Sequence, residues 1–244
     1  MFTLYLNIVT FILVLIVNFF AETIPLNDQT TGEISNKLDV ILTPAGFTFS
    51  IWIVIYILVG IWVFRQIPSN RRNLRLYRAT SPYFIISNLL NCAWIFLWHY
   101  EQFLASVIIM LLLLLSLIFV YQRIHKAEHD FIDLFPFSIY LGWITVATFV
   151  NIAYYVKYLG WNGFGLSMTL WSFIILIMIA VITILFRLYQ NDWAYPLVIS
   201  WSLIGIGVSN LQTHTFIAYF SFFLALLIVI LLPFIKERKR SYWR

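Results

Sequence analysis

The chain has 244 residues, of which 62% are hydrophobic and only 10% are Asp, Glu, Lys or Arg. Soluble domains are typically about 45 to 50% apolar and about 25% charged, so this composition excludes a water-soluble globule and a disordered chain. The formal net charge is +5, and the single cysteine, Cys92, excludes a disulfide framework or a cysteine-based metal site built from this chain alone.

Eight apolar segments are predicted to cross a membrane, because a helix needs about 20 apolar residues to span a roughly 30 Å hydrocarbon core. Polar breaks separate them, and they cover residues 3–21, 47–66, 81–99, 102–122, 134–156, 164–187, 194–210 and 214–235. We therefore predict an all-α fold, a polytopic membrane helix bundle of about eight transmembrane helices. Little of the chain remains for a domain outside the lipid bilayer.

The distribution of basic residues predicts the orientation, because cytoplasmic loops hold an excess of Lys and Arg. Thirteen of the fifteen Lys and Arg fall on one side of an eight-span arrangement, and only Lys37 and Lys157 fall on the other. We expect a multi-pass cell-membrane protein with both termini in the cytoplasm and residues 22–46 outside. The first span lacks a basic region before it, which favours a retained helix over a secretory signal. Anionic lipid accounts for the basic clusters, so no nucleic-acid partner is expected.

Aromatic and polar residues recur at helical spacing on one face of three predicted spans. These residues are Phe49, Trp52 and Tyr56 in the second span, Asn91 and Trp94 in the third, and Tyr140, Trp143, Ala147 and Asn151 in the fifth. Other tryptophans lie near span ends, as in an interfacial aromatic belt: Trp62, Trp98, Trp161, Trp193 and Trp243.

We call the residues on these three faces the stripe. Its amides, Asn91 and Asn151, are expected to point into the bundle, because an unpaired amide costs several kcal/mol in hydrocarbon. At 1.5 Å rise per residue, Trp52, Asn91 and Asn151 all fall about 10 Å below the predicted external surface. Two interpretations fit this arrangement. The groups hydrogen-bond across helices as packing contacts, or they line an aromatic pocket with a few polar anchors for a small molecule.

Three motifs in chain order resemble those of the TspO/MBR family, the tryptophan-rich sensory proteins related to the mitochondrial translocator protein. Residues 43–52, with Tyr56 and Gly60, resemble the entry to that family's second helix, and residues 91–94 and 140–151 resemble motifs of its third and fifth helices. Ile139 stands where the family usually has proline, which puts the entry to the fifth helix in question. The similarity implies a five-helix unit over residues 1–157, followed by three additional helices and a basic tail over 158–244.

The resemblance also implies a ligand. Members of that family are described as binding porphyrins, sterols and other hydrophobic molecules inside the bundle, so residues 22–46 would act as a lid over a porphyrin-like or sterol-like ligand. A homodimer is implied as well, and no cofactor is required. The ligand-binding candidates from the resemblance and the stripe together are Phe49, Trp52, Tyr56, Asn91, Trp94, Tyr140, Trp143, Ala147 and Asn151.

Three functions remain open: binding of the ligand for sensing or transport, degradation of a bound porphyrin by a membrane enzyme, and a structural or partner role in a membrane complex. Binding is favoured over catalysis, because neither an indole nor an amide is a useful general base near neutral pH. His125 and His129 with Glu128 match the His-x-x-Glu-His pattern of inverted zinc peptidases. They lie in a short basic loop without a soluble domain, so no catalytic or metal site is expected.

Overall fold

Residues 1–24 and 26–235 are described by a computed structural model of the chain. All regular secondary structure in these ranges is helical, as the composition and periodicity predict, and the described residues contain no strand. The helices form two compact units. The first contains Met1–Val40 and Phe49–Trp161, and the second contains Ile41–Thr48 and the described residues from Asn162 onward.

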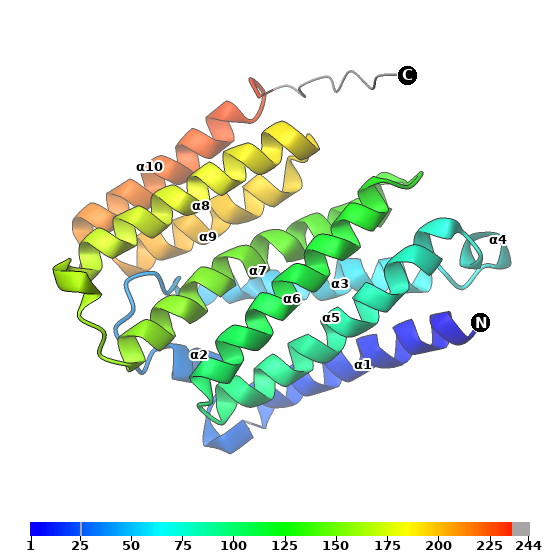
Figure 1. Cartoon of the computed structure of the whole chain (residues 1–244), viewed down its shortest axis with the longest axis horizontal. Coiled ribbons are helices and arrows are strands. Elements are labelled where there is room, and N and C mark those ends of the chain that lie inside the picture. Colours follow the sequence, from blue (N-terminus) through cyan, green and yellow to red (C-terminus); the bar gives the residue numbers. More distant parts are fainter. Residues whose placement is uncertain (25, 236–244) are drawn as a thin grey trace. The chain divides into compact units, whose positions relative to one another are not determined.

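The first unit contains five long helices and the short elements between them (Figure 1). The long helices are α1 (Phe2–Thr23), α3 (Ile51–Phe64), α5 (Arg75–His99), α6 (Phe103–His125) and α7 (Phe131–Tyr158). The short elements are η1 (Leu26–Asp28), α2 (Thr31–Ser35), the part of η2 (Gly46–Ser50) from Phe49 onward, which leads into α3, and α4 (Ser69–Arg72). Helix α5 packs against α1 and α6, and α7 packs against α3 and α6.

The five long helices alternate in direction, so their connections gather at two ends of the unit (Figure 1). We call the end with the N-terminus, α4 and the α6–α7 connection the basic end, where Arg71 pairs with Asp130. The opposite end, with η1, α2 and the α5–α6 connection, is the loop end, where Lys37 pairs with Glu101. The predicted separation of most basic residues from Lys37 and Lys157 is therefore present within this unit.

Helix α1 is held to α5 by polar side chains that share one face of an otherwise apolar helix. The amide nitrogen of Asn7 donates to Ser81 Oγ at 2.7 Å, and the amide of Asn88 donates to Thr10 Oγ1 at 3.1 Å. Asn7 is fully buried. Because an unpaired amide is costly away from water, these bonds fix the rotation of α1 against α5.

The second unit contains η3 (Gly163–Gly165), α8 (Met168–Gln190), α9 (Ala194–Ser209) and α10 (Thr215–Leu231). Helix α8 ends where Asn191 adopts a left-handed conformation with φ of 53°, which asparagine tolerates better than most residues. Helices α9 and α10 are close neighbours. A Cβ added at Gly207 of α9 would lie 2.7 Å from Phe222 Cδ1, so only glycine allows this approach.

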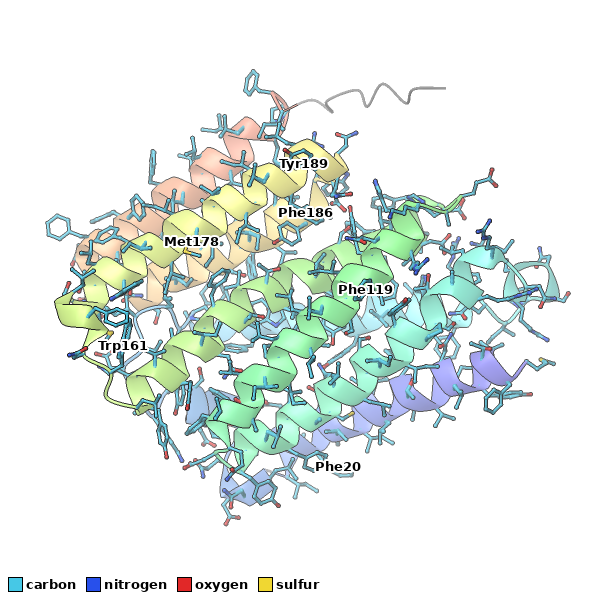
Figure 2. The ribbon with its side chains drawn as sticks, in the orientation of Figure 1. Phe20, Phe119, Trp161, Met178, Phe186 and Tyr189 are labelled. Atoms are coloured by element: carbon cyan, nitrogen blue, oxygen red, sulfur yellow. The ribbon has the colours of Figure 1, made fainter. Side chains whose placement is uncertain are left out.

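Six of the eight predicted spans are long and apolar enough to cross a membrane, and the last two are shorter. Helices α9 and α10 have 16 and 17 residues. At 1.5 Å per residue they extend about 24 and 26 Å, which is less than a typical hydrocarbon core. Figure 2 shows many apolar side chains on the outside of the helices, among them Phe20 on α1 and Met178 on α8, which are 43% and 46% exposed.

Two sequence expectations are corrected here. Trp62 and Trp98 are only 0% and 4% exposed, so they are core residues and do not belong to an interfacial belt. Trp62 packs edge-on against Phe137 at 4.9 Å, because its helix face turns toward α7. Helix α7 begins at Phe131, three residues before the predicted span, and continues through Pro136. Trp243 and the basic tail lie outside the described residues.

Candidate functional site

Five aromatic side chains from η2, α3 and α7 meet inside the first unit, and we call them the aromatic cluster. Trp52 stacks on Tyr56 with ring centroids 5.3 Å apart, and it meets Tyr140 and Trp143 edge-on at 5.7 and 6.2 Å. Phe49 meets Trp143 edge-on at 5.6 Å. The sequence spacing places these rings correctly, since Phe49, Trp52 and Tyr56 share one helical face and Tyr140 and Trp143 share another.

The two sides of the aromatic cluster differ in accessibility. Tyr140 and Trp143 on α7 are both 3% exposed, whereas Phe49, Trp52 and Tyr56 are half-buried. Helix α7 therefore supplies the fixed inner wall, and α3 with η2 supplies the side that a molecule could approach. Edge-to-face and stacked contacts of this kind favour offset packing of a further flat ring.

Two hydrogen-bonded asparagine side chains, Asn18 and Asn91, support the inner wall, and we call them the amide relay. Asn91 on α5 donates from its side chain to the Tyr140 hydroxyl at 3.0 Å, and its oxygen accepts from the Asn18 amide at 2.9 Å. Asn91 is 1% exposed. Three helices are thus joined by two hydrogen bonds at the level of the aromatic cluster. Sequence reasoning missed Asn18, although an asparagine within the apolar run of α1, eleven residues after Asn7, was a usable signal.

The Tyr56 hydroxyl is the unusual polar group of the aromatic cluster. Its oxygen is buried and interacts with the Asn91 side chain, but it makes no hydrogen bond of ordinary geometry among the described residues. A buried hydroxyl whose hydrogen bonding is incomplete is costly. A polar edge of a bound molecule would remove that cost, whereas a purely structural packing contact would leave it in place.

The other predicted site residues lie apart from the aromatic cluster. Trp94 donates from its indole to Asn151 Oδ1 at 3.3 Å, and the Asn151 amide donates to Ser106 Oγ at 3.2 Å. These bonds join α5, α6 and α7. Ala147 is half-buried on α7, one turn after Trp143.

The structure therefore differs from the expectation that Trp52, Asn91 and Asn151 lie at one depth. Trp52 and Asn91 both contact Tyr140, which precedes Asn151 by eleven residues, or about 16 Å along α7. Counting residues from the external surface assumes that the helix ends on that side are level, and the contacts of Trp52 and Asn91 with Tyr140 contradict that assumption. Asn151 consequently lies closer to the loop end.

The first part of the predicted lid, residues 22–40, covers the loop end of the first unit. Helix α2 begins at a capping box in which Thr30 and Glu33 bond each other's backbone. Ile34 is fully buried, and its carbonyl accepts from the Tyr154 hydroxyl at 2.9 Å. The Thr31 carbonyl accepts from the Trp98 indole at 3.3 Å. This part is fastened to α5 and α7 and is not a free loop.

The second part, Ile41–Thr48, belongs to the other compact unit and is held by α9. The Asn210 amide donates to the Ile41 carbonyl at 2.7 Å, and the Trp201 indole donates to the Thr48 carbonyl at 3.2 Å. The Ala45 amide donates to the Gly205 carbonyl at 3.0 Å. Sequence reasoning expected residues 22–46 to act as one lid over residues 1–157. The presence of a tryptophan and an asparagine in α9 was the signal for this contact.

The basic end carries a group of charges that the structure brings together. Asp133 is 1% exposed, accepts from the Tyr77 hydroxyl at 3.0 Å and pairs with Arg71 at 3.2 Å. Asp130 pairs with Arg65 at 2.6 Å. The hydrogen bonds from Arg65 and then Arg71 lower the pKa of the Asp130 carboxyl, because they stabilise its charged form. The sequence predicted that the basic residues share one side of the membrane, but it did not indicate which carboxylates pair with them.

Within residues 1–24 and 26–235, no group of three or more His, Cys, Asp or Glu side chains is arranged to hold a metal ion. His125 stacks on Tyr121 with ring centroids 5.7 Å apart. The aromatic cluster and the adjoining Asn91 offer rings, two phenolic hydroxyls and one amide, none of which is a general base near neutral pH. This chemistry suits the binding of a flat apolar molecule with a polar edge.

Comparison with known proteins gives one match. The model of the family described as TSPO-like protein matches residues 4–234. The match includes α8, α9 and α10, whereas the motif resemblance ended near residue 157. No curated protein and no solved structure matches the chain.

Proposed function

Because the chain belongs to the TSPO-like protein family, we propose that it binds a hydrophobic planar ligand at the aromatic cluster, for sensing or transport. The chain is a multi-pass membrane protein, with six helices long and apolar enough to span a bilayer. A tetrapyrrole or a sterol-like molecule is the ligand class that the proposal names.

One observation carries the proposal most directly. The aromatic cluster combines the half-buried Trp52 and Tyr56 with a buried Tyr56 hydroxyl that makes no hydrogen bond of ordinary geometry among the described residues. A conjugated ring with a carbonyl or carboxylate edge would stack on Trp52 and pair with that hydroxyl. Each stacked aromatic pair contributes about 0.5 to 1.5 kcal/mol beyond the burial of apolar surface.

The test is a titration of the purified full chain with protoporphyrin, followed by the quenching of tryptophan fluorescence. Trp52→Phe and Trp143→Phe are expected to weaken binding about tenfold, because each loses ring area at the aromatic cluster. Trp193→Phe is the matched control, since Trp193 is 46% exposed at the start of α9, in the other unit. Tyr56→Phe tests the hydroxyl separately.

The proposal fails if protoporphyrin does not quench the fluorescence saturably, or if Trp193→Phe weakens binding as much as Trp52→Phe. Recovery of unchanged porphyrin after incubation supports binding, whereas new absorbing products that require Trp52 and Trp143 would indicate degradation. A sterol competing with porphyrin for the same site would broaden the ligand class without moving the site.

The proposal includes eight membrane crossings in a cell membrane, with both termini cytoplasmic. The shorter α9 and α10 cross if the bilayer thins around them, at a cost of a fraction of a kcal/mol per Å.

Cysteine labelling tests the orientation, and the native Cys92 does not interfere with it because it is buried. A membrane-impermeant maleimide is expected to label Asn36→Cys in intact cells and Asn73→Cys only after permeabilisation. The reverse pattern would overturn the orientation.

A further inference from the structure

A cavity lies at the basic end of the first unit, and no residue of the aromatic cluster lines it. Its volume is about 740 Å³, which is within the range of small-molecule sites. Residues from the start of α5, the end of α6 and the start of α7 line it, and Figure 1 shows where these helices begin and end. The residues that line it are Arg71, Leu74, Arg75, Leu76, Ala79, Arg123, Lys126, Ala127, Glu128, His129, Asp130 and Asp133.

The carboxylates of Asp130 and Asp133 are already neutralised within the protein. Arg65 and Arg71 pair with them at 2.6 to 3.6 Å, so two positive charges offset two negative charges. Arg65 does not line the cavity, and Arg71 is oriented toward both carboxylates and Tyr77. Arg71, Asp130 and Asp133 form the floor of the cavity, and their pairing with each other and with Arg65 leaves no free negative charge there.

The rest of the wall is positive. Arg75, Arg123 and Lys126 carry three positive charges against one carboxylate, Glu128, which leaves a net charge of +2. Arg75 and Lys126 have no ion-pair partner in the part of the chain that the structure describes. Arg123 lies over the Tyr83 ring at 5.6 Å, which leaves its charge unneutralised. An anion is therefore the ligand that the wall would attract.

The position of the cavity indicates which kind of molecule carries the anionic group. Three apolar helices have their ends at the cavity, so it lies at the level of the lipid headgroups. Its wall also includes the apolar Leu74, which is 40% exposed, and Leu76. A soluble phosphate has no apolar group that could pack on this apolar surface, whereas a phospholipid places glycerol and acyl groups directly beside its phosphate.

We propose that this cavity is a binding site for the phosphate-bearing headgroup of an anionic phospholipid, held by Arg75, Arg123 and Lys126. The planar guanidinium of an arginine bonds two phosphate oxygens at once, and the lysine adds a point charge. The site is independent of the aromatic cluster and of its ligand.

The test measures lipid binding to the full chain in neutral detergent, by native mass spectrometry and by thermal stabilisation. The probes are phosphatidylglycerol and phosphatidylcholine with identical acyl chains, and inorganic phosphate. Wild-type protein is expected to bind phosphatidylglycerol at least tenfold more tightly than phosphatidylcholine. Arg75→Gln with Lys126→Gln should remove most of that difference, since each basic group near a lipid surface is worth about a factor of five.

Arg78→Gln is the matched control. Arg78 is exposed on α5, three residues after Arg75, and does not line the cavity. The proposal requires Arg78→Gln to bind phosphatidylglycerol like the wild type, and Arg75→Lys to bind more weakly than the wild type but more tightly than Arg75→Gln, since lysine keeps the charge and loses the bidentate bond. Equal losses in Arg78→Gln and in the double variant would show only diffuse surface attraction and overturn the site. Displacement of the lipid by inorganic phosphate at micromolar concentration would overturn the lipid assignment in favour of a soluble phosphate.

The unliganded melting temperature of each variant shows whether it has folded. Phosphatidylglycerol binding should be unchanged in Trp52→Phe, and porphyrin quenching should be unchanged in the Arg75 and Lys126 variant. Failure of one proposal is therefore distinguishable from failure of the other.

Discussion

Replacing Asp133 with alanine is expected to destabilise the first unit strongly, because a buried carboxylate organises its basic end. The Asp133 side chain is 2% exposed and receives the Tyr77 hydroxyl at 3.0 Å, Arg71 at 3.2 Å and the Asp130 backbone amide at 3.2 Å. Removal takes away the acceptor of the buried Tyr77 hydroxyl and leaves the exposed Asp130 as the remaining counter-charge of Arg65 and Arg71.

The magnitude follows from these partners. A lost neutral hydrogen bond costs about 1 kcal/mol and a lost charge-assisted bond about 1.5 to 3 kcal/mol. The arginine side chains are 23% and 28% exposed, so water offsets part of the second cost. We expect Asp133→Ala to lower the free energy of unfolding by about 3 kcal/mol.

Unfolding in mixed micelles with increasing sodium dodecyl sulfate, followed by far-ultraviolet circular dichroism, measures this loss. Asp130→Ala is the control, because the Asp130 side chain is 64% exposed and its loss should be clearly smaller. Asp133→Asn combined with Arg71→Gln should cost less than the sum of the two single changes. Equal losses for Asp133→Ala and Asp130→Ala would refute the claim that burial of the carboxylate matters.

Three further predictions concern other parts of the chain. Gly205→Ala should cost about 1 to 3 kcal/mol and speed proteolysis of residues 41–48, because its Cβ would overlap the Thr48 methyl group. Asn91→Leu should lower the unfolding free energy by about 1 to 2 kcal/mol in the same detergent assay, because it unpairs two polar groups inside the bundle. The Asp130 carboxyl should titrate by NMR below the usual range, and Arg65→Gln should raise that pKa. Since its folded pKa is lowered, the contribution of Asp130 is present above the unfolded pKa and is lost as pH falls through the folded value.

Control substitutions distinguish these specific effects from a general loss of stability. Gly46→Ala lies in the same segment as Thr48, and its Cβ would meet open space, so it should be neutral. If Gly46→Ala and Gly205→Ala accelerate proteolysis equally, close packing against α9 is not the cause. An unchanged Asn91→Leu protein would mean that the amide relay does not stabilise the bundle.

The contact between Ile41–Thr48 and α9 connects the C-terminal helices to the entry of α3. Residues 46–50 form η2, which leads directly into the helix that carries Trp52 and Tyr56. The C-terminal helices are therefore fastened to the chain immediately before the proposed ligand site. This observation gives the extension a structural role that the motif resemblance did not contain.

Composition and periodicity were enough for the helical class, the membrane setting and the two faces that carry Trp52 and Trp143. Those properties depend on local spacing and on the cost of polar groups in hydrocarbon, both of which are present in the sequence itself. The alternation of basic residues likewise predicted which connections share an end of the first unit.

Only the tertiary structure decided which polar groups meet. It paired Asn91 with Asn18 and Tyr140, placed Asn151 with Trp94 about 16 Å further along α7, and assigned Ile41–Thr48 to α9. Partner choice depends on helix length, tilt and side-chain reach, which residue counting from predicted ends does not contain. The same reason explains why the burial of Asp133 at the centre of the basic end could not be predicted from the sequence.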